Sequence, residues 1–214
     1  MKLKGLYAVT PDLADTSELL RRAEQALLGG IRLMQYRNKT AGAALRREQA
    51  AALLALCRRH GVPLVINDDL ALAMGIGADG AHLGREDGDL AAARAALGPG
   101  KLLGISCYDE MERAREAGRI GADYIAFGSF FASPTKPAAV RAPLTLLAEA
   151  RNELRLPVCA IGGITLENAP QLIAAGVDLL AVISDLFEAP DIAARAAAYA
   201  KIWQMPLTPR VRPA

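Results

Sequence analysis

The stretch LVINDDLALAMGIGADGAHLGRED, residues 64–87, contains two short apolar segments that are each followed at once by polar residues. The first segment, 64–66, runs into Asn67-Asp68-Asp69, and the second, 80–83, runs into Gly84-Arg85-Glu86-Asp87. Short apolar runs bounded by turn residues are typical of buried strands, and the residues between them predict a brief helix. The stretch therefore predicts two strands of one sheet, with polar side chains at the carboxyl end of each.

Two aspartates, Asp68 and Asp87, come just after these strands. A carboxylate in this position is held by the sheet and still faces solvent or a ligand. Two carboxylates on neighbouring strands suit Mg²⁺, with a phosphorylated substrate supplying further oxygen ligands. The alternative is that each aspartate only caps the helix that follows it.

The same alternation of apolar runs and amphipathic stretches continues along the whole chain. We predict eight strands, at 6–9, 31–36, 64–66, 80–83, 102–106, 124–127, 157–161 and 179–183. We also predict eight helices, the first capped by Thr16 or Ser17 and ended by Gly29-Gly30, and the others at 42–60, 70–74, 90–97, 110–117, 144–155, 168–175 and 192–203.

The fold class follows from this alternation. Continuously apolar strands indicate a parallel sheet that is buried on both faces. Eight strand–helix units favour a closed (β/α)8 TIM barrel, with its site at the carboxyl ends of the strands. A doubly wound open sheet would need a glycine-rich turn after the first strand, and Thr10-Pro11-Asp12 stands there instead. We expect a single-domain α/β barrel over residues 1–204 and a flexible tail over 205–214.

Composition excludes several function classes. The net charge of +2 over 214 residues is too small to indicate nucleic-acid binding. Cys57, Cys107 and Cys159 are widely spaced and show no metal-ligand pattern, so we expect buried, reduced thiols. No leader peptide and no apolar run of membrane-spanning length is present in the sequence, which predicts a cytoplasmic protein without a membrane partner. The oligomeric state is left open, and a homo-oligomer is compatible with everything above.

Polar and basic residues gather where the predicted strands end. The second strand ends in Gln35-Tyr36-Arg37-Asn38-Lys39, whose two cations suit a polyphosphate. Asn67 and Ser106 end two further strands, and Lys136 lies in the long loop after residue 127. Solvated loop cations are the alternative, because Arg and Lys are mostly exposed in proteins.

The last two strands carry a different signal. Gly162-Gly163 follows the seventh strand and Ser184 follows the eighth, a region where barrels often bind phosphate. The mouth of the barrel is therefore predicted to hold two anion sites, one basic and metal-assisted and the other a neutral cradle. His82 lies between the carboxylates, as an orienting or a catalytic residue.

At these residues the chain resembles the thiamine phosphate synthase family over nearly its full length. The matching segments are Tyr7-Ala8-Val9-Thr10, Gln35-Tyr36-Arg37-Asn38-Lys39, Ile66-Asn67-Asp68, His82-Leu83-Gly84-Arg85-Glu86-Asp87, Gly104-Ile105-Ser106, Thr135-Lys136, Ala160-Ile161-Gly162-Gly163-Ile164 and Val182-Ile183-Ser184. The resemblance implies a Mg²⁺-dependent enzyme, a transferase that joins hydroxymethylpyrimidine diphosphate to hydroxyethylthiazole phosphate, or to its carboxylated form. The products are thiamine monophosphate and pyrophosphate, and the reaction passes through a pyrimidine carbocation.

The resemblance also implies roles for individual residues. Asp68 and Asp87 hold the metal, and the catalytic residues are Arg37, Lys39, Ser106 and Lys136. The pyrimidine diphosphate is bound by Gln35, Tyr36, Arg37, Asn38, Lys39, Asn67, Ser106 and Lys136. The thiazole phosphate is bound by Ser133, Pro134, Thr135, Gly163, Ile183 and Ser184.

The chain departs from the family pattern in the loop after the sixth strand. Ser129 and Ala132 replace prolines, and Ser133 replaces a threonine but keeps a hydroxyl. We expect changed loop stiffness and retained binding. Arg85 stands where glutamine is common, and its effect is not defined by the pattern.

Two other functions compete with this one. A thiazole tautomerase of the same fold would need a base, such as a histidine, and no metal-bound diphosphate. A catalytically silent phosphate-binding barrel would act as a sensor or scaffold. The retained aspartates and cations favour the synthase.

Overall fold

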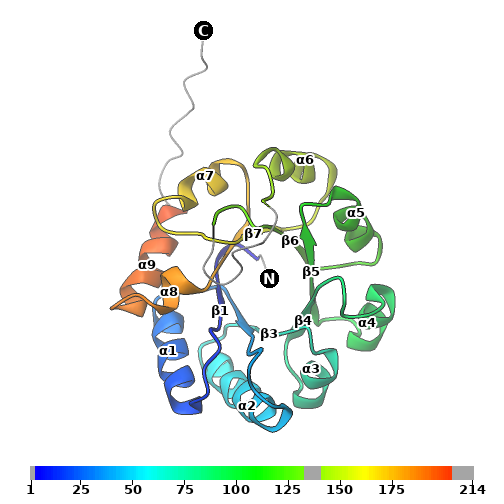
Figure 1. The fold of residues 1–214 in the computed structure, drawn as a ribbon. Helices are drawn as coiled ribbons and strands as arrows, with labels where there is room; N and C mark the ends of the chain where they lie inside the picture. Colours follow the sequence, from blue (N-terminus) through cyan, green and yellow to red (C-terminus); the bar gives the residue numbers. More distant parts are fainter. Residues whose placement is uncertain (1–2, 133–140, 204–214) are drawn as a thin grey trace.

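Eight parallel strands close into a barrel in the order in which they occur in the chain (Figure 1). This computed structural model describes residues 3–132 and 141–203. The strands are β1 Gly5–Val9, β2 Leu33–Tyr36, β3 Leu64–Asn67, β4 Gly80–Leu83, β5 Leu102–Tyr108, β6 Tyr124–Phe127, β7 Val158–Ile161 and β8 Leu179–Val182. β1 pairs with both β2 and β8, which closes the barrel and confirms the predicted fold class.

The helices surround the barrel and cover its outer face. They are α1 Thr16–Leu28, α2 Ala43–Arg59, α3 Leu70–Ile76, α4 Leu90–Leu97, α5 Met111–Arg119, α6 Thr145–Glu153, α7 Ala169–Ala174, α8 Ser184–Phe187 and α9 Ile192–Ile202. The sequence predicted eight helices, whereas the described residues contain nine. The additional one is the four-residue α8, which is too short to show a helical period. The N-cap of α1 is Asp15, which accepts from the amide of Glu18, and not Thr16 or Ser17.

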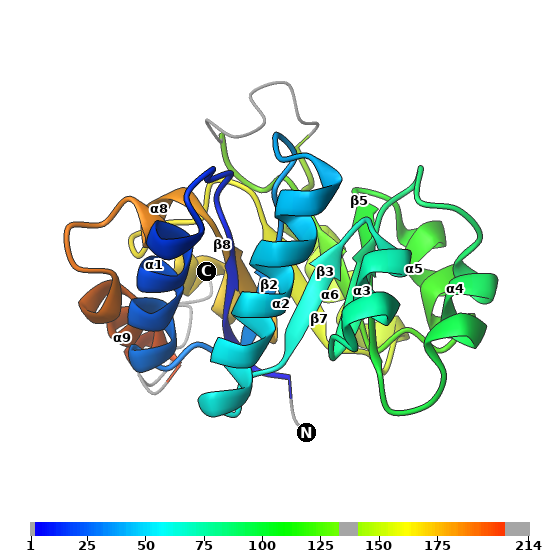
Figure 2. The same cartoon turned by 90° about the horizontal axis from the view of Figure 1, so that it is seen from below.

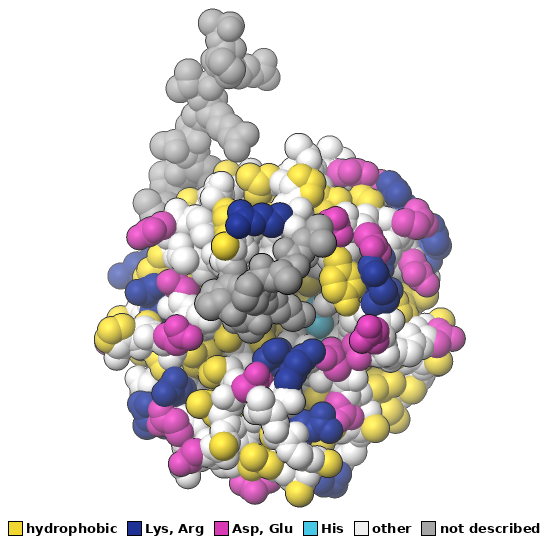
Figure 3. Space-filling view, in the orientation of Figure 1, with side chains coloured by type: hydrophobic (Ala, Val, Ile, Leu, Met, Phe, Trp, Pro, Cys, Tyr) yellow, Lys and Arg dark blue, Asp and Glu magenta, His cyan; other side chains and the backbone are white. Residues whose placement is uncertain are grey.

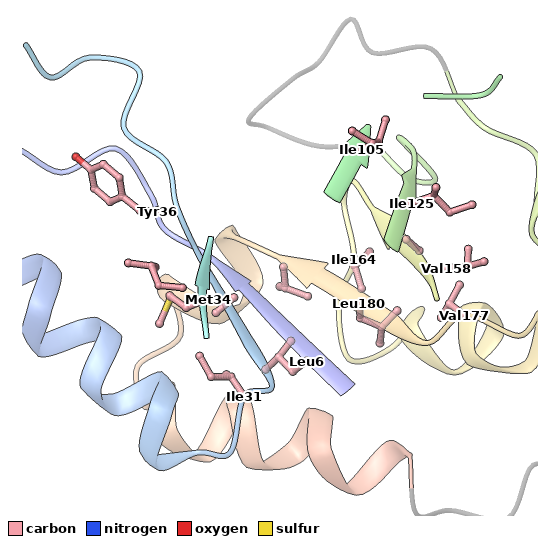
Figure 4. Close-up of a cluster of buried hydrophobic side chains, with 14 of the residues drawn as sticks. Leu6, Ile31, Met34, Tyr36, Ile105, Ile125, Val158, Ile164, Val177 and Leu180 are labelled. Carbon is pink, nitrogen blue, oxygen red and sulfur yellow. The ribbon is translucent and has the colours of Figure 1, made fainter. Parts of the chain in front are cut away.

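Side chains alternate between the barrel interior and the layer beneath the helices, because successive residues of a strand point to opposite faces. In β2, Leu33 lies in the interior cluster and Met34 packs outward. Figure 4 shows part of the outer layer, including Leu6, Ile31 and Met34. This parity decides which strand residues reach a site inside the barrel mouth.

The loops that follow the strands form one rim of the barrel. In Figure 2 the N-terminus lies below the barrel, so β1 runs upward and the loops after the strands form the upper rim. This is the end at which the sequence placed the candidate residues.

The three cysteines are buried thiols, as predicted. Burial raises the pKa of both Cys57 and Cys107 to about 12, so these side chains stay neutral. None of the helices in the described part of the chain is both long and apolar enough to cross a bilayer.

Candidate active site

A cavity of about 560 Å³ opens at the carboxyl ends of the strands. In Figure 3, which looks onto this end of the barrel, basic and acidic side chains and a histidine show near the centre of the face. Seven of the predicted site residues line the cavity: Gln35, Arg37, Asn67, Ser106, Gly163, Ile183 and Ser184. Barrel closure brings them together from distant parts of the sequence.

Asp68 and Asp87 are not helix caps. Asp69 caps α3 by accepting from the amide of Leu72 at 2.8 Å, and Asp89 caps α4 through the amides of Ala91 and Ala92. Asp68 has a left-handed backbone, with φ of 61°. A nearby aspartate therefore caps each helix, and the two predicted metal ligands, Asp68 and Asp87, do not act as caps.

The two released carboxylates face each other across the loops after β3 and β4. Partial burial raises the pKa of Asp87, and the neighbouring Asp68 carboxylate raises it further, against the opposing effects of the Gly84 amide and the Lys39 ammonium. Asp87 Oδ2 accepts from Gly84 N at 2.6 Å, and Lys39 Nζ lies 3.4 Å from Asp68 Oδ2. The two carboxylates repel each other when both are ionised, and a bound cation would offset this repulsion.

This pair fits Mg²⁺ in one specific way. Among residues 3–132 and 141–203, no cluster of three or more His, Cys, Asp and Glu side chains is arranged to hold a metal ion. Mg²⁺ commonly takes only one or two carboxylates and completes its shell with water and substrate phosphate. The donor set therefore suits an ion that arrives with a phosphorylated substrate.

The two cations after β2 are organised by Asp12, which the sequence analysis did not single out. Asp12 Oδ1 and Oδ2 lie 3.0 and 3.1 Å from Arg37 Nη1, and Oδ1 also accepts from the backbone amide of Lys39 at 2.8 Å. Thr10 Oγ1 accepts from Arg37 N and donates to Arg37 O, both at 2.8 Å. The signal that could have revealed Asp12 is its position directly after the first strand.

Two residues predicted to bind substrate lie elsewhere. The Tyr36 hydroxyl donates to Gln49 Oε1 at 2.9 Å, in the layer between barrel and helices. Asn38 Nδ2 donates to Leu13 O and Gln49 Oε1, while Asn38 Oδ1 accepts from the Thr40 amide. Neither residue lines the cavity, so the prediction of substrate contacts is corrected to a structural role for both side chains. Strand parity is the reason for Tyr36, because its neighbour Gln35 takes the inward position.

The glycine pair after β7 is needed for close packing. A Cβ on Gly162 would lie 1.9 Å from Ser129 Oγ, and one on Gly163 would lie 2.2 Å from Ala132 O. Both glycines also have positive φ, at 102° and 62°. The pair lets the loop after β6 lie directly on the loop after β7, beside Ser184 at the start of α8.

The remaining thiazole-side residues of the prediction, Ser133, Pro134 and Thr135, lie outside the described residues, as does Lys136.

A chain of hydrogen bonds crosses the barrel along the cavity wall. Gln35 Nε2 donates to Tyr7 Oη at 2.5 Å, and Tyr7 Oη lies 2.8 Å from Tyr124 Oη. Tyr124 Oη lies 3.0 Å from His82 Nδ1, and His82 Nε2 lies 2.8 Å from Ser106 Oγ. We call these five side chains the interior polar chain. Of the two roles left open for His82, these contacts support an orienting one.

Comparison with known proteins shows which family the chain belongs to. The family model described as thiamine monophosphate synthase matches residues 6–186. A thiamine-phosphate synthase of Aromatoleum aromaticum is 60% identical over 92% of this chain and 95% of its own length. The chain belongs to the thiamine monophosphate synthase family. Its activity is accordingly that of a thiamine-phosphate synthase, which is a transferase.

Other members of the family support the assignment. A thiamine-phosphate synthase of an Azoarcus species is 57% identical over 94% of this chain and 98% of its own length. The solved structure of a thiamine phosphate pyrophosphorylase from Pyrococcus furiosus superposes with a TM-score of 0.81 at 33% identity, over 95% of this chain and 96% of that one. The synthase, rather than the tautomerase or the silent barrel, is thus the reading that the relatives support.

Arg85, a departure from the family pattern, lies on the cavity wall. Its guanidinium stands 5.0 Å from the ring centre of Tyr108 and pairs with Glu110. Its backbone amide donates to the Tyr108 hydroxyl at 3.2 Å. Arg85 therefore ties the loop that carries Asp87 to the end of β5.

Ser129, one of the two departures on the described part of the loop after β6, makes a local contact. Its Oγ donates to Phe131 O at 2.8 Å, a bond that a proline could not form. The effect on loop stiffness stays a prediction.

Proposed function

We propose that this member of the family joins a hydroxymethylpyrimidine diphosphate to a hydroxyethylthiazole phosphate by assisted departure of pyrophosphate. What supports the proposal is that two unlike sets of side chains follow the strands at the same end of the barrel. On one side stand the Asp68–Asp87 pair and two cations, Arg37 and Lys39. On the other side lies the neutral cradle around Gly163 and Ser184.

The charged side would receive the diphosphate. Asp68 and Asp87 would hold Mg²⁺, which when bound neutralises charge that develops on the departing oxygens. Arg37 would turn its guanidinium from Asp12 toward the phosphates, and Lys39 would leave Asp68 when a metal ion takes that carboxylate. Asn67 lines the cavity and would offer an amide. Lys136 is assigned to this side from the sequence alone.

The neutral side would receive the thiazole phosphate. Gly163 presents backbone without a Cβ, and Ser184 opens α8 with an amide and a hydroxyl.

The bond changes balance without a general base. The C–O bond between the pyrimidine methylene and the diphosphate breaks, and its electron pair leaves on the pyrophosphate oxygen. The lone pair of the thiazole nitrogen then forms the new C–N bond. The chain's residues hold both partners and stabilise the leaving anion, and no proton has to be removed.

Release of pyrophosphate tests the proposal. We expect release only when both substrates and Mg²⁺ are present, and loss of release when a chelator is added. Release that is unaffected by the chelator would contradict the metal role, and release without the thiazole phosphate would contradict the coupling of the two sites. A cytoplasmic location and a homo-oligomeric assembly stay proposals from the sequence.

A further inference from the structure

The interior polar chain links side chains from opposite parts of the barrel. Its members come from five strands, β2, β1, β6, β4 and β5, and both of its ends, Gln35 and Ser106, line the cavity. Tyr7 and Tyr124 expose only 1% and 0% of their surface to solvent. In such surroundings each hydroxyl proton must find an acceptor, because an unpaired buried donor is costly.

The direction of every bond in the chain follows from the first one. Either tyrosine oxygen could donate in the Tyr7–Tyr124 bond, but with Gln35 Nε2 donating to Tyr7 Oη we assign the single Tyr7 hydroxyl proton to Tyr124 Oη. The Tyr124 proton then goes to His82 Nδ1, which must be an acceptor. A neutral imidazole with an acceptor at Nδ1 carries its proton on Nε2 and donates to Ser106 Oγ.

The two ends of the chain therefore face the cavity with opposite character. Ser106 Oγ already accepts from His82, so its own proton is available to a ligand. The Gln35 amide uses one of its two N–H donors on Tyr7, and this orientation of the amide turns Oε1, its acceptor, away from Tyr7. Turning the Gln35 amide over, so that Oε1 faces Tyr7, would require every proton in the chain to reverse with it.

The rings are also held against rotation. The Tyr7 and Tyr124 rings meet edge to face at 5.8 Å, and the His82 ring stacks on Tyr124 at 5.5 Å. Burial raises the pKa of Tyr124 well above its ordinary value, so its hydroxyl stays protonated. Burial likewise raises the pKa of Tyr7, so both tyrosines of the chain are neutral.

We propose that Tyr7, Tyr124 and His82 are positioning residues that set the hydrogen-bond polarity of the cavity and so select the heteroaromatic substrate. One acceptor and one donor suit a ring whose edge offers an amino group and an unprotonated ring nitrogen. The oxo analogue of that ring exchanges both roles, since it presents a carbonyl and a ring N–H. The inference rests on the proposed function, because it concerns the pyrimidine partner of that reaction.

The first test compares two diphosphates, the aminopyrimidine and its oxo analogue, through the ratio of their kcat/KM values. Tyr124→Phe interrupts the chain at its centre, so Gln35 and Ser106 become free to reorient. We expect the discrimination ratio to fall by about tenfold or more, because an intact hydrogen-bonding site rejects an analogue with mismatched groups. The KM for the thiazole phosphate should not change.

Tyr36→Phe is the matched control. It also removes one buried hydroxyl, but this hydroxyl bonds Gln49 outside the barrel. We expect its discrimination ratio to stay at the wild-type value. An unchanged ratio in Tyr124→Phe, or an equal fall in Tyr36→Phe, would overturn the proposal.

A second measurement needs neither a variant nor turnover. The ¹⁵N shifts of the imidazole nitrogens of the wild-type protein report the tautomer of His82, and His60 is the only other histidine in the chain. We expect a neutral ring protonated at Nε2. A ring protonated at Nδ1, or at both nitrogens, would overturn the assigned polarity. If the wild type fails to make thiamine phosphate from the amino substrate, the proposed function is wrong. The tautomer of His82 still tests the assigned hydrogen-bond directions in that case.

Discussion

The active site depends on neighbouring residues of one type that do different work. Asp68 and Asp69 are adjacent, yet Asp69 caps α3 while Asp68 faces Asp87 and Lys39. Asp68 stands one residue before the N-cap of α3 and has a left-handed backbone. Aspartate and asparagine tolerate this conformation better than most residues.

Asp68→Asn tests the metal role with the backbone conformation retained. We expect turnover to fall by about 100-fold or more, because one charged ligand for Mg²⁺ is lost. Asp69→Asn is the control, since asparagine caps a helix about as well as aspartate and this change also removes one negative charge. Steady-state kinetics over a series of Mg²⁺ concentrations measures both variants. Equal loss in the two would mean that local charge, and not ligation, matters.

Asp87→Asn should stabilise the protein near neutral pH when Mg²⁺ is absent. A carboxyl with a raised folded-state pKa is costly when ionised, so it destabilises the native state above that pKa and not below the unfolded value. The gain in melting temperature should therefore shrink as the pH falls through the folded-state pKa toward the ordinary value of 3.8. Thermal unfolding in metal-free buffer across this range measures the effect. A gain that is independent of pH would contradict the electrostatic explanation.

At the scale of elements, α9 holds the two loops of the neutral cradle together. Tyr199 on α9 donates to Asp185 Oδ2 at 2.7 Å and lies 3.4 Å from Ile164 O. Arg195, also on α9, pairs with Asp185 Oδ1 at 2.6 Å. Asp185 belongs to α8, so the helix that the sequence analysis missed is anchored to the last helix of the barrel.

Tyr199→Phe should weaken use of the thiazole phosphate selectively. The lost hydrogen bond contributes about 0.5–1.5 kcal/mol, which corresponds to a rise in KM of up to about tenfold. The KM for the pyrimidine diphosphate should stay unchanged, because Arg37 and Lys39 are organised by Asp12 instead. Initial rates with each substrate varied in turn measure the two constants. An equal rise in both would argue for a general loss of structure.

At the scale of the whole molecule, the charged site joins loops after three strands, β2, β3 and β4, through Lys39, Asp68 and Asp87. A ligand that bridges these loops binds only the closed barrel. Ligation and global stability should therefore be linked.

Pyrophosphate together with Mg²⁺ should raise the melting temperature. At a concentration of 100 times Kd the stabilisation is about 2.7 kcal/mol, or about 5–10 °C for a chain of this size. Either component alone should give a smaller shift, and Asp68→Asn should remove the joint effect. Scanning calorimetry with the four combinations measures it. Additive shifts from the separate components would contradict a shared site.

Most of the fold could be predicted from the sequence, because its strands and longer helices are encoded locally. β4, β6 and α4 have the predicted bounds, since apolar runs and turn residues mark both of their ends. The prediction failed where the signal was short or ambiguous. α8 is a single turn, and the cap of α1 lies among several residues that can all serve as caps.

Local sequence patterns account for the alternation of strands and helices and for the residues that stand at each strand end. Which of these residues meet depends on the closure of the barrel. Tyr7 and Tyr124 are 117 positions apart, and they share a hydrogen bond because closure of the barrel brings β1 and β6 across a common interior. Gln35 likewise lines the cavity while Tyr36 packs in the outer layer, because neighbouring side chains of a strand face opposite sides of the sheet. Which side is the interior depends on how the other strands close the barrel.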